Sequence, residues 1–595
     1  MKVAIVQKAP SKTDYERHFK VPIAEVFNLS SKPVSRLLKK DVDLVDFDPH
    51  KFDYVILIGS EAAKHFTKVT AVTNYTGRLV GPELSKSDYP NFIISISPAV
   101  LAFKPENRPV FEATVADIHK ILKGLGPSTV EKDYQYFEAH QSKEANDYIR
   151  SVIRSKYSII ALDSETSSLE PREGYPIGIS ISHKVDQGVY IHGDAVDEIT
   201  IMLLQELIDK KDVVLHNAKF DLKYFAYHYG IKFDHREGHI HDTMILHYLL
   251  DERTGTHGLK PLAMKYTNLG DYDRELDEWK DNYCKTHGIN KEFFTYDLIP
   301  WDIIKLYAVK DTDATLQLFN KFYPFIEKNE NLHRCYYELQ LPVLHLLTNM
   351  EDVGVNVSRN RLEQANILLD NKLAKLKKEL WSYDAIKALE EEQHAVFNPN
   401  SVPQLRKLLF DYLKLPVPDK RTTTGAISTD TSVLQDLAKI HKVPDLVYQI
   451  RKTTKLKNTY INKLLPVIND DGRVRTGFHQ VTTTSGRLSS SGRFNMQQLP
   501  RDEPLIKGCV IAPPGYKIVA LDLTTAEIYY AAVLSGDKEL QSVFINMQRN
   551  PEMYSDFHST IAFMVFQLKC DPKDVKKLYP ALRQAAKAIS FGINV

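Results

Sequence analysis

The segment ALDSETSSLE, residues 161–170, follows the apolar run YSII and ends an expected strand with acidic side chains. Asp163 and Glu165 are two residues apart, and alternate residues of a strand point to the same face. Two carboxylates on one face can hold a hard divalent cation such as Mg²⁺. The pattern has a simpler interpretation when taken alone, because Asp-x-Glu on an exposed strand is usually solvated charge.

Two later segments carry further acidic side chains. LHNAKFDLKYF, residues 215–225, puts Asp221 four residues after Asn217, where a helical pattern begins. LYAVKDTDATLQLF, residues 306–319, puts Tyr307 four residues before Asp311, and this spacing places both on one face of a helix. The structural alternatives are a half-buried aromatic residue for Tyr307 and a helix-surface charge for Asp311.

In order and spacing, the three segments resemble the exonuclease motifs of the DnaQ-like 3′–5′ proofreading domain, in the version attached to DNA polymerase I. The resemblance implies an RNase H-like fold and two Mg²⁺ ions, or Mn²⁺ in their place, held by Asp163, Glu165, Asp221 and Asp311. One ion would activate a water and the other would stabilise the leaving 3′ oxygen. Tyr307 would orient the attacking water through its hydroxyl.

A second set of motifs begins with YKIVALDLTTAEIYYAAVLSGD, residues 516–537. It puts Asp522 at the end of an expected apolar strand, where an aspartate is either a metal ligand or a helix N-cap. The segment resembles motif A of the family A DNA polymerases. This implies that Asp522 binds both metals of a polymerase site and that Glu527 lies under the sugar of the incoming nucleotide. Leu523, Thr525 and Tyr529 depart from the family pattern.

The segment RQAAKAISFG, residues 583–592, repeats a functional side chain every four residues and resembles motif B of the same family. The resemblance implies that Arg583 and Lys587 bind the phosphates of a dNTP and that Phe591 packs against its base. His558, in DFHSTIA, would also touch the phosphates. The structural alternative for these cations is a solvated helix face.

Two segments are expected to contact DNA. TTSGRLSSSGRFNMQQLP, residues 483–500, resembles the family segment that holds the primer–template, with Asn495 in it and with Arg487 and Gln497 as donors to the minor groove. RKTTKLKNTYINKLL, residues 451–465, resembles the basic helix at the base of the thumb. The residues expected to meet phosphates there are Arg451, Lys452, Lys455 and Lys457. A Ser/Thr-rich turn and a solvated charged face are the alternatives.

The third polymerase motif of the family, His-Asp-Glu, does not occur in the sequence, and the one HDT, at His241, lies in the exonuclease segment. The 595 residues therefore contain one of the two palm aspartates of the family. We expect that they do not polymerise alone, and that a second polypeptide carries the remainder or that it was lost by truncation.

The first segment of the chain alternates short apolar runs with helix-compatible stretches, which is typical of an α/β unit. VILIGSEAAKHF and TGRLVGPE resemble the uracil-DNA glycosylase superfamily, but the His-Pro-Ala-like loop reads Ser97, Pro98, Ala99 and lacks the histidine. The expectation is a non-catalytic relative that binds DNA or docks a replication protein. An unrelated α/β domain is the alternative.

The expected architecture is multidomain, with α/β and α parts. The domains are 1–130, an N-terminal α/β domain; 131–330, the 3′–5′ exonuclease; 331–480, a helical polymerase region that includes the thumb; and 481–595, a palm portion with motif A and partial fingers with motif B. Together the last two form part of a right-hand polymerase.

Composition agrees with a globular protein, since 43% of the 595 residues are hydrophobic, 26% are charged and the net charge is +1. Four scattered cysteines indicate reduced thiols, and no apolar stretch reaches the length of a membrane span or signal peptide. We expect a cytoplasmic protein of a phage-infected bacterium, with other phage replication proteins as partners.

The leading functional hypothesis is the N-terminal part of a replicative DNA polymerase that proofreads, with primer–template DNA and dNTPs as substrates. One alternative is a stand-alone 3′–5′ exonuclease whose polymerase-like half only clamps DNA. The other is a non-enzymatic DNA-binding or assembly module.

Overall fold

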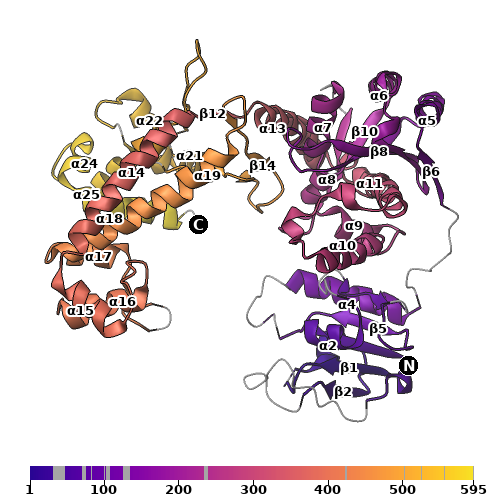
Figure 1. The fold of residues 1–595 in the computed structure, drawn as a ribbon, viewed down its shortest axis with the longest axis horizontal. Helices are drawn as coiled ribbons and strands as arrows, with labels where there is room; N and C mark the ends of the chain where they lie inside the picture. Colours follow the sequence, from indigo (N-terminus) through magenta and orange to yellow (C-terminus); the bar gives the residue numbers. More distant parts are fainter. Residues whose placement is uncertain are drawn as a thin grey trace. The chain divides into compact units, whose positions relative to one another are not determined.

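The computed structural model describes the chain except residues 12, 31–46, 70–74, 82–83, 100, 102–107, 125–133, 234–238, 423–424, 501–502, 524, 555 and 594–595. The chain divides into two compact units, Met1–Cys509 and Val510–Val595, which are described separately (Figure 1). In the described part of the chain, no helix is both long and apolar enough to cross a lipid bilayer.

The first sheet of the large unit has the strand order β2-β1-β3-β5-β4 and is parallel except for the pair β4–β5. Its strands are β1 (Val3–Gln7), β2 (Glu25–Asn28), β3 (Tyr54–Ile58), β4 (Leu79–Val80) and β5 (Phe92–Ser95), and its helices include α1 (Tyr15–Phe19), α2 (Gly59–Phe66) and α4 (Arg108–Leu122). Separate apolar clusters cover its two faces, with Val3 and Ile5 in one and Ala4 and Val6 in the other. Burial on both faces explains why MKVAIV is apolar without alternation.

The second sheet has six strands in the order β11-β10-β7-β8-β9-β6. They are β6 (Gln135–Ala139), β7 (Ile159–Thr166), β8 (Pro176–Lys184), β9 (Gln187–His192), β10 (Asp212–Leu215) and β11 (Ile240–Asp242). The central strand β7 pairs antiparallel with β8 and parallel with β10. The strand expected to end at Asp163 and Glu165, after YSII, is confirmed.

Helices flank the second sheet, and the longest, α11 (Trp301–Glu327), contacts β7, β8 and β9. The other helices are α5 (Ser142–Arg154), α6 (Glu198–Lys210), α7 (Lys219–Tyr229), α8 (Thr243–Leu250), α9 (Leu259–Tyr266) and α10 (Arg274–His287). One continuous apolar cluster joins strand residues such as Ile160 and Val214 to Leu318 and Phe322 of α11. This core fixes α11 over the sheet.

A helical region follows, in which α14 (Arg359–Leu380) packs against α18 (Lys442–Leu456), as Figure 1 shows. Its further helices include α12 (Glu330–Arg334), α13 (Leu341–Val353), α15 (Asp384–Gln393), α16 (Val402–Arg406), α17 (Thr431–Leu437), α19 (Asn462–Leu464) and α20 (Pro504–Lys507). Two small antiparallel pairs accompany them, β12 (Val355–Asn356) with β13 (Arg473–Val474) and β14 (Gly477–His479) with β15 (Ser489–Ser491).

The small unit is helical, with α21 (Ala526–Ser535), α22 (Lys538–Arg549), α23 (Phe557–Phe566), α24 (Val575–Leu578) and α25 (Pro580–Ile593). The strand predicted in YKIVALDL, residues 516–523, is wrong: the described residues of this segment have no regular secondary structure. Val519 is 77% exposed and Leu521 is 93% exposed. The physical reason is that a strand needs a hydrogen-bonded neighbour, and no described strand pairs with this segment.

Candidate active sites

Three acidic side chains converge at the centre of the second sheet. Strand β7 places Asp163 and Glu165 on one face, and α11 brings Asp311 against it. The ligand atoms of these three residues lie within 4.8 Å of one another. Carboxylate oxygens of this number and spacing fit a hard divalent cation.

Asp221, the fourth predicted acid, lies beside this group and is held by β7. Its buried Oδ1 accepts hydrogen bonds from Ser164 N at 2.9 Å and from Ser164 Oγ at 2.7 Å. Ser164 lies between Asp163 and Glu165 on the strand, so α7 is tied to the backbone that carries both acids. We call Asp163, Glu165, Asp221 and Asp311 the carboxylate cluster.

Withdrawal from water and mutual repulsion make these groups hold protons. Burial, followed by the charges of Asp221, Glu165 and Asp311, raises the pKa of Asp163 well above its ordinary value. Burial also raises the pKa of Glu165 to about 8 and that of Asp221 to about 7. Raised pKa values show that the carboxylates are close together without enough positive charge to balance them. A bound divalent cation would supply that charge.

The thermal stability of the metal-free protein should therefore depend on pH. The folded-state pKa of Glu165 lies above its unfolded value, so this group stabilises the fold below the unfolded pKa and loses that contribution as pH rises through about 8. We expect Tm in EDTA to fall from about pH 5 to about pH 8, between the unfolded and folded pKa values of Glu165. Glu165→Gln should flatten this slope, and an unchanged slope in the variant would contradict the assignment.

Two cluster neighbours were not identified from the sequence. The Lys260 ammonium on α9 forms an ion pair with Asp311, and the Tyr272 hydroxyl donates a hydrogen bond to the same carboxylate. Lys260 Nζ also lies 3.9 Å from the centroid of the Tyr307 ring. In the sequence Lys260 is 51 residues from Asp311, and only the docking of α9 against α11 brings them together.

Replacing Lys260 by Met should destabilise the metal-free protein, because it removes the cation that faces Asp311. The side chain of Lys260 is 23% exposed, so we expect a loss of about 2 kcal/mol, below the full cost of breaking a buried pair. Lys265→Met, on the exposed side of the same helix, is the matched control. Mn²⁺ should narrow the difference in Tm between Lys260→Met and wild type; equal Tm values in EDTA would contradict this role.

Tyr307 lies one helical turn before Asp311 on α11 and is partly buried. Burial and the charges of Asp311 and Glu165 raise the pKa of its hydroxyl, which therefore stays protonated. A protonated phenol beside the carboxylates can donate a hydrogen bond to a water or to a phosphate oxygen.

The predicted DNA-contacting segment, residues 483–500, contains strand β15 of the hairpin β14–β15 and the turn after it. Asn495 caps the following turn, with Oδ1 accepting from Ser490 Oγ at 2.6 Å and Nδ2 donating to Ser490 O at 2.7 Å. The side-chain amide of Gln497 also lies within hydrogen-bond distance of Ser490 Oγ, at 2.6 Å. Arg487 and Gln497 are exposed, whereas the side chain of Asn495 is hydrogen-bonded within the turn.

The four basic residues of α18 and its extension differ in placement. Arg451 donates to Pro399 O at 2.7 Å and to Thr429 O at 3.1 Å, so its guanidinium fastens the helix to its neighbours. Lys452 pairs with Glu503 at 2.7 Å, Lys457 pairs with Asp370, and Lys455 is exposed. A phosphate contact by Arg451 would require these internal bonds to break, and contacts by the three lysines stay predictions.

In the small unit, Asp522 lies in the exposed segment 516–523 rather than at a strand end, and Glu527 is exposed in the first turn of α21. α23 and α25 pack together and bring His558 near Arg583 and Lys587, whose charges help burial lower the pKa of His558.

Arg583 is bonded to Asp556, a residue that was not among the predicted site residues. Its Nε donates to Asp556 Oδ2 at 2.6 Å, and its second nitrogen donates to Oδ1 at 2.9 Å. Asp556 also caps α23. Lys587 is exposed on α25, whereas the side chain of Phe591 lies outside the described residues.

In the first sheet region, Pro98 and Ala99 border a pocket of about 620 Å³, which Arg17, His18 and Arg108 also line. This region has the α/β character predicted from its alternating pattern. The resemblance to uracil-DNA glycosylases stays a prediction.

Known proteins match both halves of the chain. The family profile described as DNA polymerase family A matches residues 359–594, and the profile described as 3′–5′ exonuclease matches residues 136–327. Proteins of these families use divalent metal ions. The residues matched by the exonuclease profile include all four members of the carboxylate cluster.

The chain is similar to the DNA polymerase of Escherichia phage T5, with 52% identity over all of this chain and 70% of that protein. It is 30% identical to DNA polymerase I of Treponema pallidum over 64% of this chain, and covers only 35% of that protein.

Among solved structures, the fold resembles the POL domain of Pol1 from M. smegmatis in complex with DNA primer-template and dNTP. The TM-score is 0.56 at 23% identity, over 77% of this chain and 71% of that one. This likeness concerns the fold alone. The family profiles and the phage relative confirm the family predicted from the motifs: the chain belongs to the family A DNA polymerases and carries their 3′–5′ exonuclease domain.

Proposed function

We propose that the carboxylate cluster is a two-metal 3′–5′ exonuclease site that shortens DNA from its 3′ end. The observation that carries this proposal is the convergence of Asp163, Glu165 and Asp311 within 4.8 Å, with Asp221 bonded to the strand between the first two. Oxygen-only donors favour Mg²⁺, and Mn²⁺ is an alternative.

The chain's own residues would prepare the reaction in three ways. The cluster would hold the ions, which when bound supply Lewis-acid activation of water and stabilise the leaving 3′ oxygen. Tyr307 would orient the attacking water through its protonated hydroxyl. Lys260 and Tyr272 would fix the carboxylate of Asp311.

The test is degradation of a single-stranded oligonucleotide labelled at its 5′ end. Stepwise shortening that needs Mg²⁺ or Mn²⁺ supports the proposal, and EDTA should stop it. A 3′-phosphorothioate end should slow the first step. Loss of label from the 5′ end, or no metal-dependent shortening, would contradict it.

We also propose that the second half acts on primer–template DNA and dNTPs, as part of a replicative polymerase whose palm needs a carboxylate in addition to Asp522. Arg583, Lys587 and His558 would meet the triphosphate, and Arg487 and Gln497 the minor groove. Two features support the need for a further element: no His-Asp-Glu occurs in these residues, and none of the described strands pairs with the exposed segment 516–523.

A second polypeptide is our candidate source of that element, and other phage replication proteins are further candidate partners. The alternative is that the 595 residues act only as an exonuclease and that the polymerase-like half holds DNA. Primer extension with and without a polypeptide that carries His-Asp-Glu separates the two.

A further inference from the structure

The helix that carries Asp221 has a second functional face. Lys219 and Lys223 lie one turn apart on α7, with Asp221 between them in sequence. Both ammonium groups bind one carboxylate, that of Glu351 on α13, at 2.5 Å for Lys219 and 2.7 Å for Lys223. Asp221 bonds to β7 on the other side, so α7 joins the carboxylate cluster to a buried ion group.

The hairpin β14–β15 takes part in this ion group through the backbone of Phe478. Phe478 N donates to Glu351 Oε1 at 2.7 Å, and Lys219 donates to Phe478 O. We call Lys219, Glu351 and the backbone of Phe478 the polar link. It connects α7 to the hairpin whose second strand, β15, belongs to the predicted DNA-contacting segment.

The polar link is buried, so its charges depend on one another. The side chain of Glu351 is 4% exposed and that of Lys219 is 10% exposed. Burial opposes the ionisation of Glu351, yet Lys223 and Lys219 more than offset it and hold its pKa below the ordinary value. Removing Glu351 would leave Lys219 without its buried counter-ion, and removing Lys219 would leave Glu351 with Lys223 as its remaining ion-pair partner.

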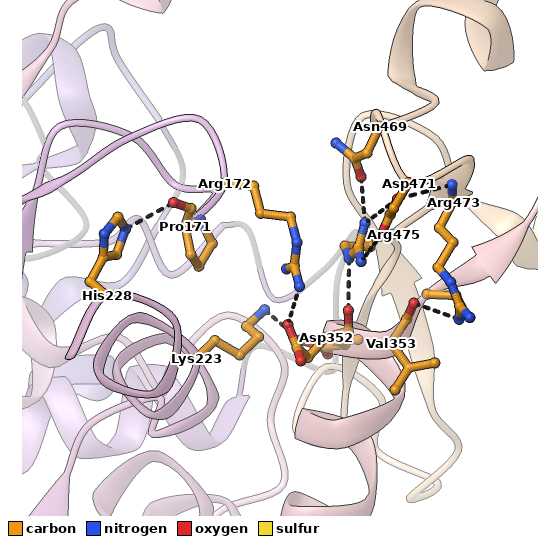
Figure 2. Close-up of polar contacts among 12 residues, drawn as sticks. Pro171, Arg172, Lys223, His228, Asp352, Val353, Asn469, Asp471, Arg473 and Arg475 are labelled. Atoms are coloured by element: carbon orange, nitrogen blue, oxygen red, sulfur yellow. Dashed lines mark hydrogen bonds and ion pairs between the residues drawn. The ribbon is translucent and has the colours of Figure 1, made fainter. Parts of the chain in front are cut away.

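Surrounding contacts immobilise the C-terminal turn of α13, which carries Glu351. Arg172 pairs with Asp352 at 2.8 Å, and Arg475 and Arg473 donate to Asp352 O at 2.7 Å and to Val353 O at 3.0 Å. Figure 2 shows these contacts around the end of α13. His228 of α7 bonds to Pro171 O at 2.9 Å (Figure 2). The anchor of the polar link is therefore fixed by these contacts.

We propose that the polar link positions Asp221, with Lys219 and Glu351 as positioning residues for the exonuclease reaction; this inference rests on the function proposed above. Hydrogen bonds are directional, so the bonds from Lys219 to Glu351 and to Phe478 O restrain the rotation of α7 about its axis, in addition to the packing of its apolar side chains in the core. Any rotation that moves Lys219 also moves Asp221, two residues along the same helix. The bonds of Asp221 to Ser164 would then change.

The test compares Lys219→Met and Glu351→Gln with the double variant Lys219→Met/Glu351→Met. Each is assayed for Tm, for kcat and KM on a single-stranded oligonucleotide, and for the Mn²⁺ affinity of the metal-free protein. For the single variants we expect kcat and Mn²⁺ affinity to fall by about tenfold, the usual effect of losing a residue that orients a metal ligand, with KM unchanged.

The double variant separates positioning from stability. Replacing a buried ion pair by apolar side chains is often neutral for stability, so the Tm of the double variant should exceed that of either single variant, although Lys223 and Phe478 N also lose their bond to Glu351. The two Met side chains cannot make the directional bonds to each other and to Phe478 O that the polar link supplies, so kcat and Mn²⁺ affinity should stay low. If kcat and Mn²⁺ affinity recover together with Tm in the double variant, the inference is overturned. It is also overturned if the single variants have a lower Tm but unchanged kcat and Mn²⁺ affinity.

Arg473→Met is the control within the same region, because Arg473 bonds to α13 but not to α7. It should lower Tm and leave kcat and Mn²⁺ affinity unchanged. If wild type and this control both fail to degrade DNA, the proposed function fails. The Mn²⁺ affinities then still decide whether the polar link positions Asp221.

Discussion

Replacing Asp163 by Ala is expected to reduce 3′–5′ degradation of single-stranded DNA by about 10³-fold or more, which corresponds to about 4 kcal/mol of activation free energy. Asp163 lies at the centre of the carboxylate cluster, since the charges of Asp221, Glu165 and Asp311 all act on it. Without it, the remaining carboxylates would not hold the ions in place. The measurement is the initial rate of shortening with saturating Mg²⁺.

The matched control is Asp313→Asn, two residues from Asp311 on α11. Asp313 is also buried, but it accepts from Tyr136 at 2.6 Å and from Asp186 N at 3.1 Å, away from the cluster. Asp313→Asn should lower Tm and leave most of the rate of DNA shortening unchanged. If Asp163→Ala still degrades DNA, or if Asp163→Ala and Asp313→Asn lose degradation equally, the carboxylate cluster is not the catalytic site.

Asp163→Ala should also change stability in a direction that a merely structural carboxylate would not. The cluster is short of positive charge, so removing one acid should raise the Tm of the metal-free protein at about pH 8 while Asp313→Asn lowers it. This opposite sign distinguishes a ligand site from an ordinary buried acid.

Much of the exonuclease half could be predicted because its signals are local. Asp163 and Glu165 occupy alternate positions of one strand, and Tyr307 and Asp311 share one helical turn, so short-range periodicity already places each pair. Lys260 gave no such signal, because its role arises from the packing of α9 against α11. The polar link is of the same kind, since Glu351 is 132 residues from Lys219.

The polymerase half was harder to predict because its segments depend on partners. YKIVALDL has the residue types that favour a strand, but residue types do not tell whether a second strand is available to pair with it. None of the described strands pairs with this segment. Arg451 shows a different limit. A basic residue in a charge run suggests solvent or phosphate, and only the structure shows that its guanidinium binds Pro399 O and Thr429 O.

The 595 residues alone are expected not to extend a primer, at least not within about 10³-fold of a typical turnover of about 10 s⁻¹. A two-metal transfer needs several anionic ligands, and Asp522 is the one palm aspartate that the motifs identify here. The assay should use the Asp163→Ala background, so that degradation does not hide synthesis. Extension at ordinary rates that Asp522→Asn abolishes would contradict the proposal.

A complementing polypeptide that carries His-Asp-Glu should have two separable effects. It should restore primer extension, and Asp522→Asn in this chain should abolish that extension. It should also protect the backbone amides of residues 516–523 from hydrogen exchange, because strand pairing would bury N–H groups in a segment where Val519 and Leu521 are now 77% and 93% exposed. Protection without extension would mean that the partner binds but lacks the carboxylate. Extension without protection would mean that Asp522 acts from outside a sheet, and the expected strand would then play no part in the catalytic site.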